Sequence, residues 1–73
     1  MPRLPRIDGA ECIATLERLG FASVRQRGSH VVMRRGDRGC VVPLHRELKV
    51  GTLKGVLKQA GVDPNDFVQA LHR

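Results

Sequence analysis

The sequence has no tryptophan and no tyrosine, and its two phenylalanines, Phe21 and Phe67, lie in apolar patterns typical of a protein core. We therefore expect only weak stacking of nucleic-acid bases on aromatic side chains. The two cysteines, Cys12 and Cys40, have neither a CxxC pair nor a histidine at ligand spacing, which predicts no metal site and favours two buried thiols over a disulfide. No apolar run approaches eighteen residues and no signal core follows Met1, so we expect a cytoplasmic protein without a membrane segment.

The length of the chain limits the architectures open to it. A chain of 73 residues forms one domain at most and buries only about 60% of the surface that its unfolded form exposes. Two amphipathic helices over a small sheet would fit, whereas a Rossmann unit or a deep substrate cleft needs more chain. We expect a single domain over residues 1–73, with residues 1–7 as a flexible arm, and a surface site without a small-molecule cofactor.

Positive charge is concentrated in the middle of the chain. The formal net charge is +6 at pH 7, and residues 25–58 contain nine basic and two acidic residues. This concentration is typical of nucleic-acid binders, because affinity for a polyanion comes mainly from neutralised phosphates. One alternative is a solvated surface that keeps a small protein soluble. Another is a basic face that docks an acidic protein partner.

Apolar periodicity predicts an α-β-β-β-α order followed by a short third helix. The first helix is expected to run from about residue 9 to about residue 19, between the cap Asp8 and the stop Gly20. A period of two then predicts three strands joined by short turns, which form an antiparallel meander. The expected strands are 21–26, 29–35 and 40–44, the turns are 27–28 and 36–39, and the later helices begin near Thr52 and after Asp63. We expect an α+β fold in which helices cover one face of a three-stranded antiparallel sheet, and the site lies on the open face.

The most informative motif is Gly28-Ser29-His30, at the head of the second expected strand. A neutral imidazole can accept a proton near pH 7, and arginines beside it can bind a phosphate. Alternation along the strand places His30, Val32 and Arg34 on one face and buries Val31 and Met33 on the other. This combination indicates a small ribonuclease, and an ordinary strand histidine is the alternative.

Five segments together form a recognisable pattern: Leu19-Gly20-Phe21, Arg25 to His30, Val42 to His45, Glu47 to Leu53 and Leu57 to Gly61. In order and spacing they resemble the HicA family of toxins, which are mRNA interferases paired with HicB antitoxins. The resemblance covers about residues 8–71, and Val50 departs from it where the family usually has proline. It implies a fold like the double-stranded RNA-binding domain and a HicB-like antitoxin as partner.

Carried onto this sequence, the family histidine falls on His30, which the resemblance makes the expected catalytic residue of an endoribonuclease acting on mRNA. We expect its neutral imidazole to take the proton from a ribose 2′-hydroxyl, which then attacks the adjacent phosphate without a metal ion. Residues expected to bind the RNA are Arg27, Arg34, Lys49, Lys54 and Lys58. His45 is expected to be structural. The alternative function is a non-catalytic module that binds double-stranded RNA by its shape and phosphates.

Overall fold

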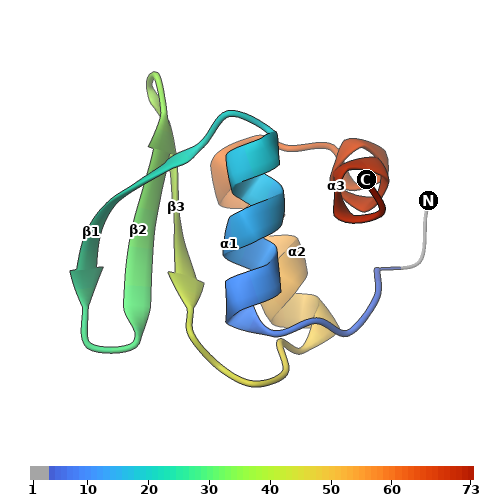
Figure 1. Cartoon of the computed structure of the whole chain (residues 1–73), viewed down its shortest axis with the longest axis horizontal. Coiled ribbons are helices and arrows are strands. Elements are labelled where there is room, and N and C mark those ends of the chain that lie inside the picture. Colours follow the sequence, from blue (N-terminus) through green and yellow to red (C-terminus); the bar gives the residue numbers. More distant parts are fainter. Residues whose placement is uncertain (1–3) are drawn as a thin grey trace.

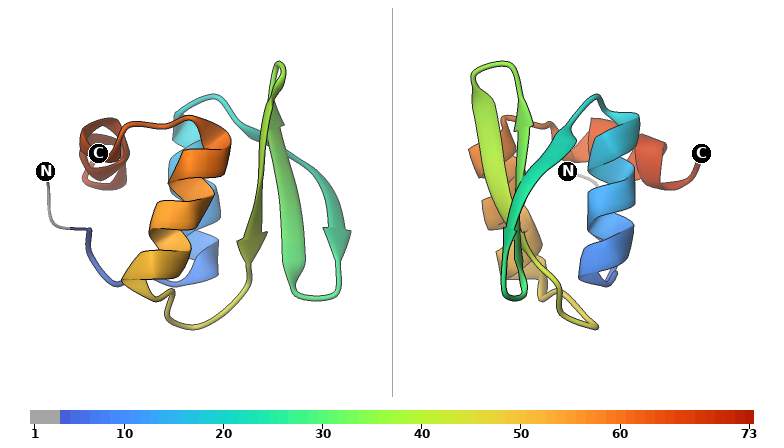
Figure 2. Two further views of the ribbon diagram at one scale, coloured as in Figure 1. Left: turned by 180° about the vertical axis from the view of Figure 1, so that it is seen from behind. Right: turned by 60° about the vertical axis from the view of Figure 1, so that its left-hand side comes forward.

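A computed structural model describes residues 4–73 as three helices and one three-stranded sheet (Figure 1). The elements in chain order are α1 (Gly9–Arg18), β1 (Ala22–Arg27), β2 (His30–Arg35), β3 (Arg38–Pro43), α2 (Val50–Ala60) and α3 (Pro64–Leu71). The strands pair in the order β1-β2-β3 and both pairs are antiparallel. Helices α1 and α2 lie on one side of the sheet, and α3 packs against α1 on the side away from it (Figures 1 and 2). This confirms the predicted α+β order and an arrangement like that of the double-stranded RNA-binding domain.

Helix α1 begins and ends at the signals found in the sequence. The side chain of Asp8 accepts a hydrogen bond of 2.7 Å from the backbone N–H of Glu11. At the other end Gly20 adopts a φ of +96°, and the N–H of Phe21 donates to the carbonyl of Leu16 at 3.0 Å. This six-to-one hydrogen bond is typical of a Schellman motif, which reverses the chain into β1.

Two-residue turns join the strands. They are Gly28-Ser29 and Gly36-Asp37, and in each the glycine has a positive φ, of +56° and +59°. A type II′ turn needs a positive φ only at its first central residue, which glycine adopts without steric cost. The first turn therefore lies one residue later than predicted, and the second ends two residues earlier, because strand pairing continues to Arg38.

The later helices also follow their local signals. Helix α2 begins at Val50, slightly earlier than predicted, and ends at Gly61, whose φ is +70°. The side chain of Asp63 accepts a hydrogen bond of 2.7 Å from the N–H of Asn65, and Pro64 is the first residue of α3. Among residues 4–73 no helix has the length and apolar character needed to cross a membrane.

The core lies between the sheet and the helices. Alternate residues of β2 and β3 point into it, and Phe67 of α3 closes it on the far side with no exposed surface. Both cysteines are buried free thiols, as predicted. The largest fully buried side chains are Phe67, Leu16, Met33, Leu48, Leu53, Leu57, Val42, Thr15 and Cys12.

The chain just before α1 packs against this core. Leu4 and Ile7 are both buried, and the N–H of Leu48 donates to the carbonyl of Ile7 at 2.7 Å. The structure therefore differs from the predicted flexible arm over residues 4–7, whereas residues 1–3 of that arm lie outside the described residues. Two apolar side chains without periodicity are enough to hold a short segment when a core surface is available to them.

Candidate functional site

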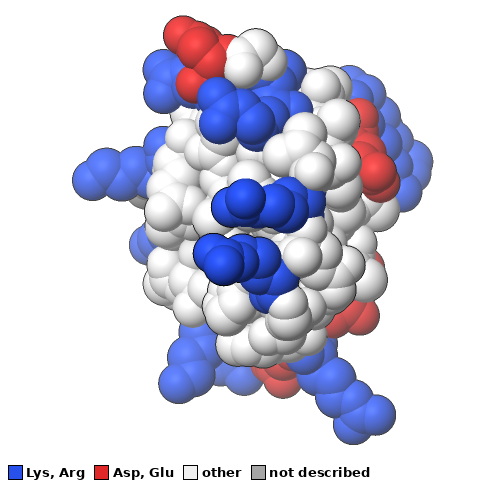
Figure 3. Space-filling model, turned by 90° about the vertical axis from the view of Figure 1, so that its left-hand side faces the viewer, with Lys and Arg blue, Asp and Glu red and all other residues white. Residues whose placement is uncertain are grey.

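The face of the sheet turned away from the helices carries three cross-strand rows of side chains. Strand register defines these rows as Arg27, His30 and Pro43; Arg25, Val32 and Val41; and Ala22, Arg34 and Gly39. None of these nine residues is acidic. Seen from the sheet side of the molecule, Lys and Arg side chains cross a largely uncharged surface, and Asp and Glu lie towards its margins (Figure 3). We call this surface the outer face.

His30 is the first residue of β2 and is exposed on the outer face. Its neighbour Val31 and the next alternate residue, Met33, are buried in the core on the other side of the sheet. The imidazole forms no ion pair with any carboxylate of residues 4–73. It is therefore free to interact with a ligand.

Two arginines of β1 flank His30. Arg27 is its direct cross-strand partner, at a Cβ separation of about 5 Å. Arg25 pairs with Val32, so it is the diagonal neighbour of His30 at about 7–8 Å. Of these two arginines, only Arg27 was predicted from the sequence as a site residue. The signal that would have found Arg25 is the spacing of two residues from Arg27, which places both on the same face of a strand.

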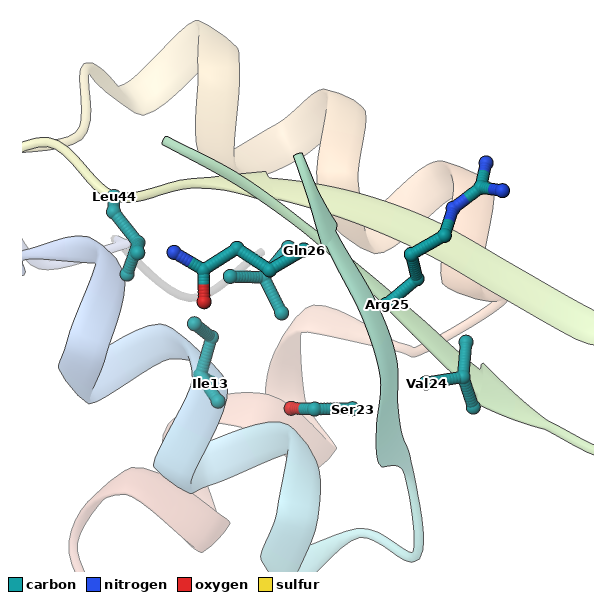
Figure 4. Close-up of a pocket in the computed structure, with 7 residues that line it drawn as sticks. Ile13, Ser23, Val24, Arg25, Gln26 and Leu44 are labelled. Carbon is teal, nitrogen blue, oxygen red and sulfur yellow. The ribbon is translucent and has the colours of Figure 1, made fainter. Parts of the chain in front are cut away.

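A β-bulge shapes the outer face next to these arginines. The pairing of β1 with β2 is irregular between Ser23 and Arg25, which makes Val24 an extra residue of the strand. Ser23 and Gln26 lie on the side of β1 that faces α1, whereas Val24 and Arg25 lie on the other side (Figure 4). The bulge therefore adds an apolar side chain to the outer face and keeps Arg25 beside His30.

Arg34 shares the outer face, as alternation predicts, but lies at its other end. It is four residues from His30 along β2, which corresponds to about 13 Å. Its side chain lies close to Gly39, its cross-strand partner. With its guanidinium against Gly39, Arg34 points to another part of the outer face than the His30 and Arg27 pair.

The lysines of α2 do not join this group. The side-chain oxygen of Gln59 accepts a hydrogen bond of 3.3 Å from the N–H of Val41, so this side of α2 faces the edge of β3. Lys58 and Lys54 lie about 100° and 140° further round the helix. There they border a shallow hollow next to the start of α3. The structure thus places both lysines on a different surface from His30.

Backbone hydrogen bonds fix the loop between β3 and α2 beside His30's end of the sheet. The N–H of Leu44 donates to the carbonyl of Ser29 at 2.6 Å, and the N–H of Gly9 donates to the carbonyl of His45 at 2.9 Å. The backbone of His45 thus holds the loop, while its side chain is exposed, and the structural role expected for its imidazole stays a prediction. The start of α2 lies at the same end of the molecule as the turn between β1 and β2 (Figure 1), and Lys49, the residue before α2, is exposed.

Two other arginines of the basic segment contact the ends of helices. The guanidinium of Arg35 donates to the carbonyl of Leu19 at 2.7 Å and lies over the ring of Phe21, 4.8 Å from its centre. The guanidinium of Arg38 lies against Gly61, at the end of α2. Cations are stabilising at helix C-termini, where carbonyl groups are left without partners. These two charges support the fold at the end of the sheet remote from His30.

A hollow of about 430 Å³ lies on the inner side of β1, between this strand and α1 (Figure 4). Its lining residues are Ile13, Ser23, Val24, Arg25, Gln26, Val31 and Leu44. The hollow forms because α1 does not cover β1, which leaves all six residues of that strand exposed. It reaches the free edge of β1, where it is bordered by two residues of the outer face, Val24 and Arg25.

The buried thiols are poor candidates for chemistry. Burial, and secondarily the nearby Cys40, raises the pKa of the Cys12 thiol to about 12, and burial also raises the pKa of Cys40. The thiolate is the nucleophilic form of cysteine, so both groups are inert at neutral pH. Among the described residues no cluster of three or more His, Cys, Asp or Glu side chains could hold a metal ion.

Comparison with protein families gives one match. A family model described as HicA toxin of bacterial toxin-antitoxin matches residues 9–62 of the 73-residue chain. The matched stretch runs from the first residue of α1 to just beyond α2 and includes His30 and the whole outer face. A search of curated proteins found no match.

Proposed function

Because the chain belongs to the HicA family of toxins from bacterial toxin–antitoxin systems, we propose that it is a ribonuclease that cleaves mRNA with His30 as its general base. The observation that carries this proposal is the position of His30: exposed, unpaired with any described carboxylate, and directly opposite Arg27 on the face that the helices leave open. An exposed imidazole beside a guanidinium combines a group that accepts a proton with a group that binds phosphate.

The chemistry needs only groups that the outer face supplies. The neutral imidazole of His30 accepts the proton of a ribose 2′-hydroxyl, and the 2′-oxygen attacks the adjacent phosphorus. The bond from phosphorus to the 5′-oxygen breaks, and that oxygen takes a proton from solvent. The products are a 2′,3′-cyclic phosphate and a 5′-hydroxyl end. This route predicts cleavage that needs no metal ion.

The arginines of β1 have the complementary role in this proposal. Arg27, directly opposite His30, would bind the phosphate under attack and stabilise the negative charge that develops on its oxygens. Arg25, diagonal to His30, would bind the same phosphate or the next one. Arg34 and Lys49, further away in opposite directions, would bind the flanking backbone. No aromatic side chain lies in the three rows, so the strand would be held by phosphates and sequence preference would be slight.

The face that would hold RNA is also open to a protein. We propose that a HicB-like antitoxin neutralises the toxin by covering His30 and the arginines around it, which would block access of the substrate. Adding the antitoxin in stoichiometric amount to toxin and RNA should then stop cleavage. Continued cleavage by the bound complex would contradict steric inhibition.

The decisive test of the nuclease is the substitution His30→Ala. We expect the initial rate of cleavage of a single-stranded RNA to fall by about 10²- to 10⁴-fold, the usual contribution of a general base. The melting temperature should not change, because the side chain is exposed. His72→Ala, which removes an exposed histidine beyond the end of α3, is the matched control and should cleave like the wild type.

The assay should also identify the products and the metal requirement. Product ends should be cyclic phosphate and 5′-hydroxyl, and excess chelator should leave the wild-type rate unchanged. Cleavage by His30→Ala at the wild-type rate, or loss of wild-type cleavage in chelator, would refute the proposed mechanism. Tight binding of duplex RNA that leaves it intact would instead support the non-catalytic binding module.

A further inference from the structure

The middle of the outer face is apolar. Val24, Val32 and Val41 come from the three strands and lie next to one another, since Val32 pairs with both Arg25 and Val41 and the bulge turns Val24 to the same side. Val24 is 55% exposed and Val41 39% exposed, which places both among the exposed large apolar side chains of the described residues. We call these three residues the valine row.

The valine row has no role in the proposed cleavage. RNA held by its phosphates uses the arginines, and its bases stack on aromatic rings, which the outer face lacks. An apolar centre surrounded by charged side chains is instead the usual anatomy of a protein–protein interface. The residues around the row are Arg25, Arg27, Arg34 and His30, and no acidic residue stands among them.

We propose that the valine row is the docking centre of the antitoxin, which covers it with apolar side chains and sets carboxylates against the surrounding arginines. This inference rests on the proposed function, because it takes the partner to be the protein of the toxin–antitoxin pair. Two observations select that occupant: the chain belongs to a family defined by such a pairing, and the outer face offers only positive charge around its apolar centre. An acidic protein surface with an apolar anchor matches both features.

The proposal divides the outer face into two sets of residues. The arginines would bind RNA in the free toxin and carboxylates in the complex, whereas the valine row would bind the antitoxin alone. Contacts between charged groups weaken as salt rises, because the screening length falls from about 10 Å at 0.1 M to about 3 Å at 1 M. Antitoxin binding should therefore persist at a salt concentration that releases RNA. Its apolar contacts would let it displace a substrate that uses the same arginines.

The test compares Val24→Thr, Val41→Thr and the double variant with Val50→Thr. Threonine keeps the shape and β-branching of valine but puts a hydroxyl into the interface. Val50 is 37% exposed at the start of α2, outside the three rows, and serves as the matched control. We expect each outer-face substitution to weaken binding of the purified HicB-like antitoxin by about tenfold, and the double variant by more. RNA cleavage and melting temperature should stay close to those of the wild type.

Affinity should be measured by calorimetry at 0.15 M and 0.5 M salt, separately from cleavage. Unchanged antitoxin affinity in the double variant would overturn the proposal, and so would a loss of RNA cleavage as large as the loss of affinity. Val24 also borders the hollow beside α1, whereas Val41 does not. Loss of antitoxin affinity in Leu44→Gln with none in Val41→Thr would therefore place the interface in that hollow and overturn the proposal. Because calorimetry needs no cleavage, an absence of RNA cleavage by the wild type would refute the nuclease without affecting this result.

Discussion

Two arginines of the sheet should respond in opposite ways to the same substitution. Arg25 lies on the outer face beside His30, and Arg35 clamps the end of α1 by a hydrogen bond to Leu19 and a contact with Phe21. Replacing either by glutamine removes the charge and keeps much of the side-chain length. We expect Arg35→Gln to lower stability without changing cleavage, and Arg25→Gln to lower cleavage without changing stability.

The size of the Arg35 effect follows from its two contacts. A hydrogen bond from a charged group contributes about 1.5–3 kcal/mol, and we take about 1 kcal/mol for this one because the guanidinium is exposed to solvent. A cation over an aromatic ring at an exposed site adds about 0.5 kcal/mol. For a domain of 73 residues, each 1 kcal/mol corresponds to about 4–8 °C in melting temperature. Together the two contacts amount to about 1.5 kcal/mol, so Arg35→Gln should melt about 6–12 °C below the wild type.

The Arg25 effect appears in the rate. Loss of a cation that stabilises the reacting phosphate should reduce cleavage by about 10- to 100-fold, somewhat less than removal of an oxyanion donor from an enclosed site. An exposed substitution away from caps and core changes stability by no more than about 0.5 kcal/mol. The assays are thermal unfolding by circular dichroism and initial cleavage rates at 25 °C, where all variants are folded. The reverse pattern, with Arg35→Gln inactive but stable, would refute the assignment of these two residues.

Three further predictions test the fold and the basic segment. Gly9→Ala should lower the free energy of unfolding by about 2–3 kcal/mol in chemical denaturation, because the added Cβ would overlap the backbone carbonyl of Pro43. A denaturation midpoint equal to that of the wild type would refute the close approach of Gly9 to Pro43. The free energy of unfolding should fall by about 1.4 kcal/mol per pH unit between pH 9 and 12, because the folded chain keeps the Cys12 proton that the unfolded chain releases. Melting temperatures measured against pH should show this loss in the wild type and a smaller one in Cys12→Ala. The double variant Lys54→Gln, Lys58→Gln should cleave RNA within about threefold of the wild-type rate, since both lysines lie on a side of α2 away from His30. A larger loss of cleavage would show that these lysines belong to the RNA interface.

The elements that the sequence predicted correctly are those with short-range signals. Asp8 and Asp63 cap the helices that follow them, and Gly20 and Gly61 adopt the positive φ that ends the helices before them. Each of these features depends on a few neighbouring residues, so it can be predicted without knowledge of the tertiary contacts. The face of His30 follows from the same local logic, because a strand with buried Val31 must turn His30 outward.

The features that the sequence missed depend on packing between distant segments. Leu4 has no periodic partner, and it is buried only because the core offers it a surface. The rotation of α2 about its axis, which separates Lys58 from His30, is set by the packing of its apolar side against β3 and the rest of the core. Charge counted along the chain therefore predicted one basic face, whereas the structure distributes that charge between the outer face, the helix ends and the flank of α2.

A chain of this size can hold a site in place without enclosing it. The helices α1 and α2 cover one face of the sheet, so the groups on the other face are positioned only by the sheet beneath them and by the connections at its two ends. At His30's end the hydrogen bonds from Leu44 to Ser29 and from Gly9 to His45 tie the turn before His30 and the loop beyond β3 to the start of α1. At the opposite end Arg35 ties the sheet to the end of the same helix. The imidazole is thereby fixed on a rigid strand while its whole exposed side stays accessible, which suits a reaction on a long polymer that a closed pocket could not admit.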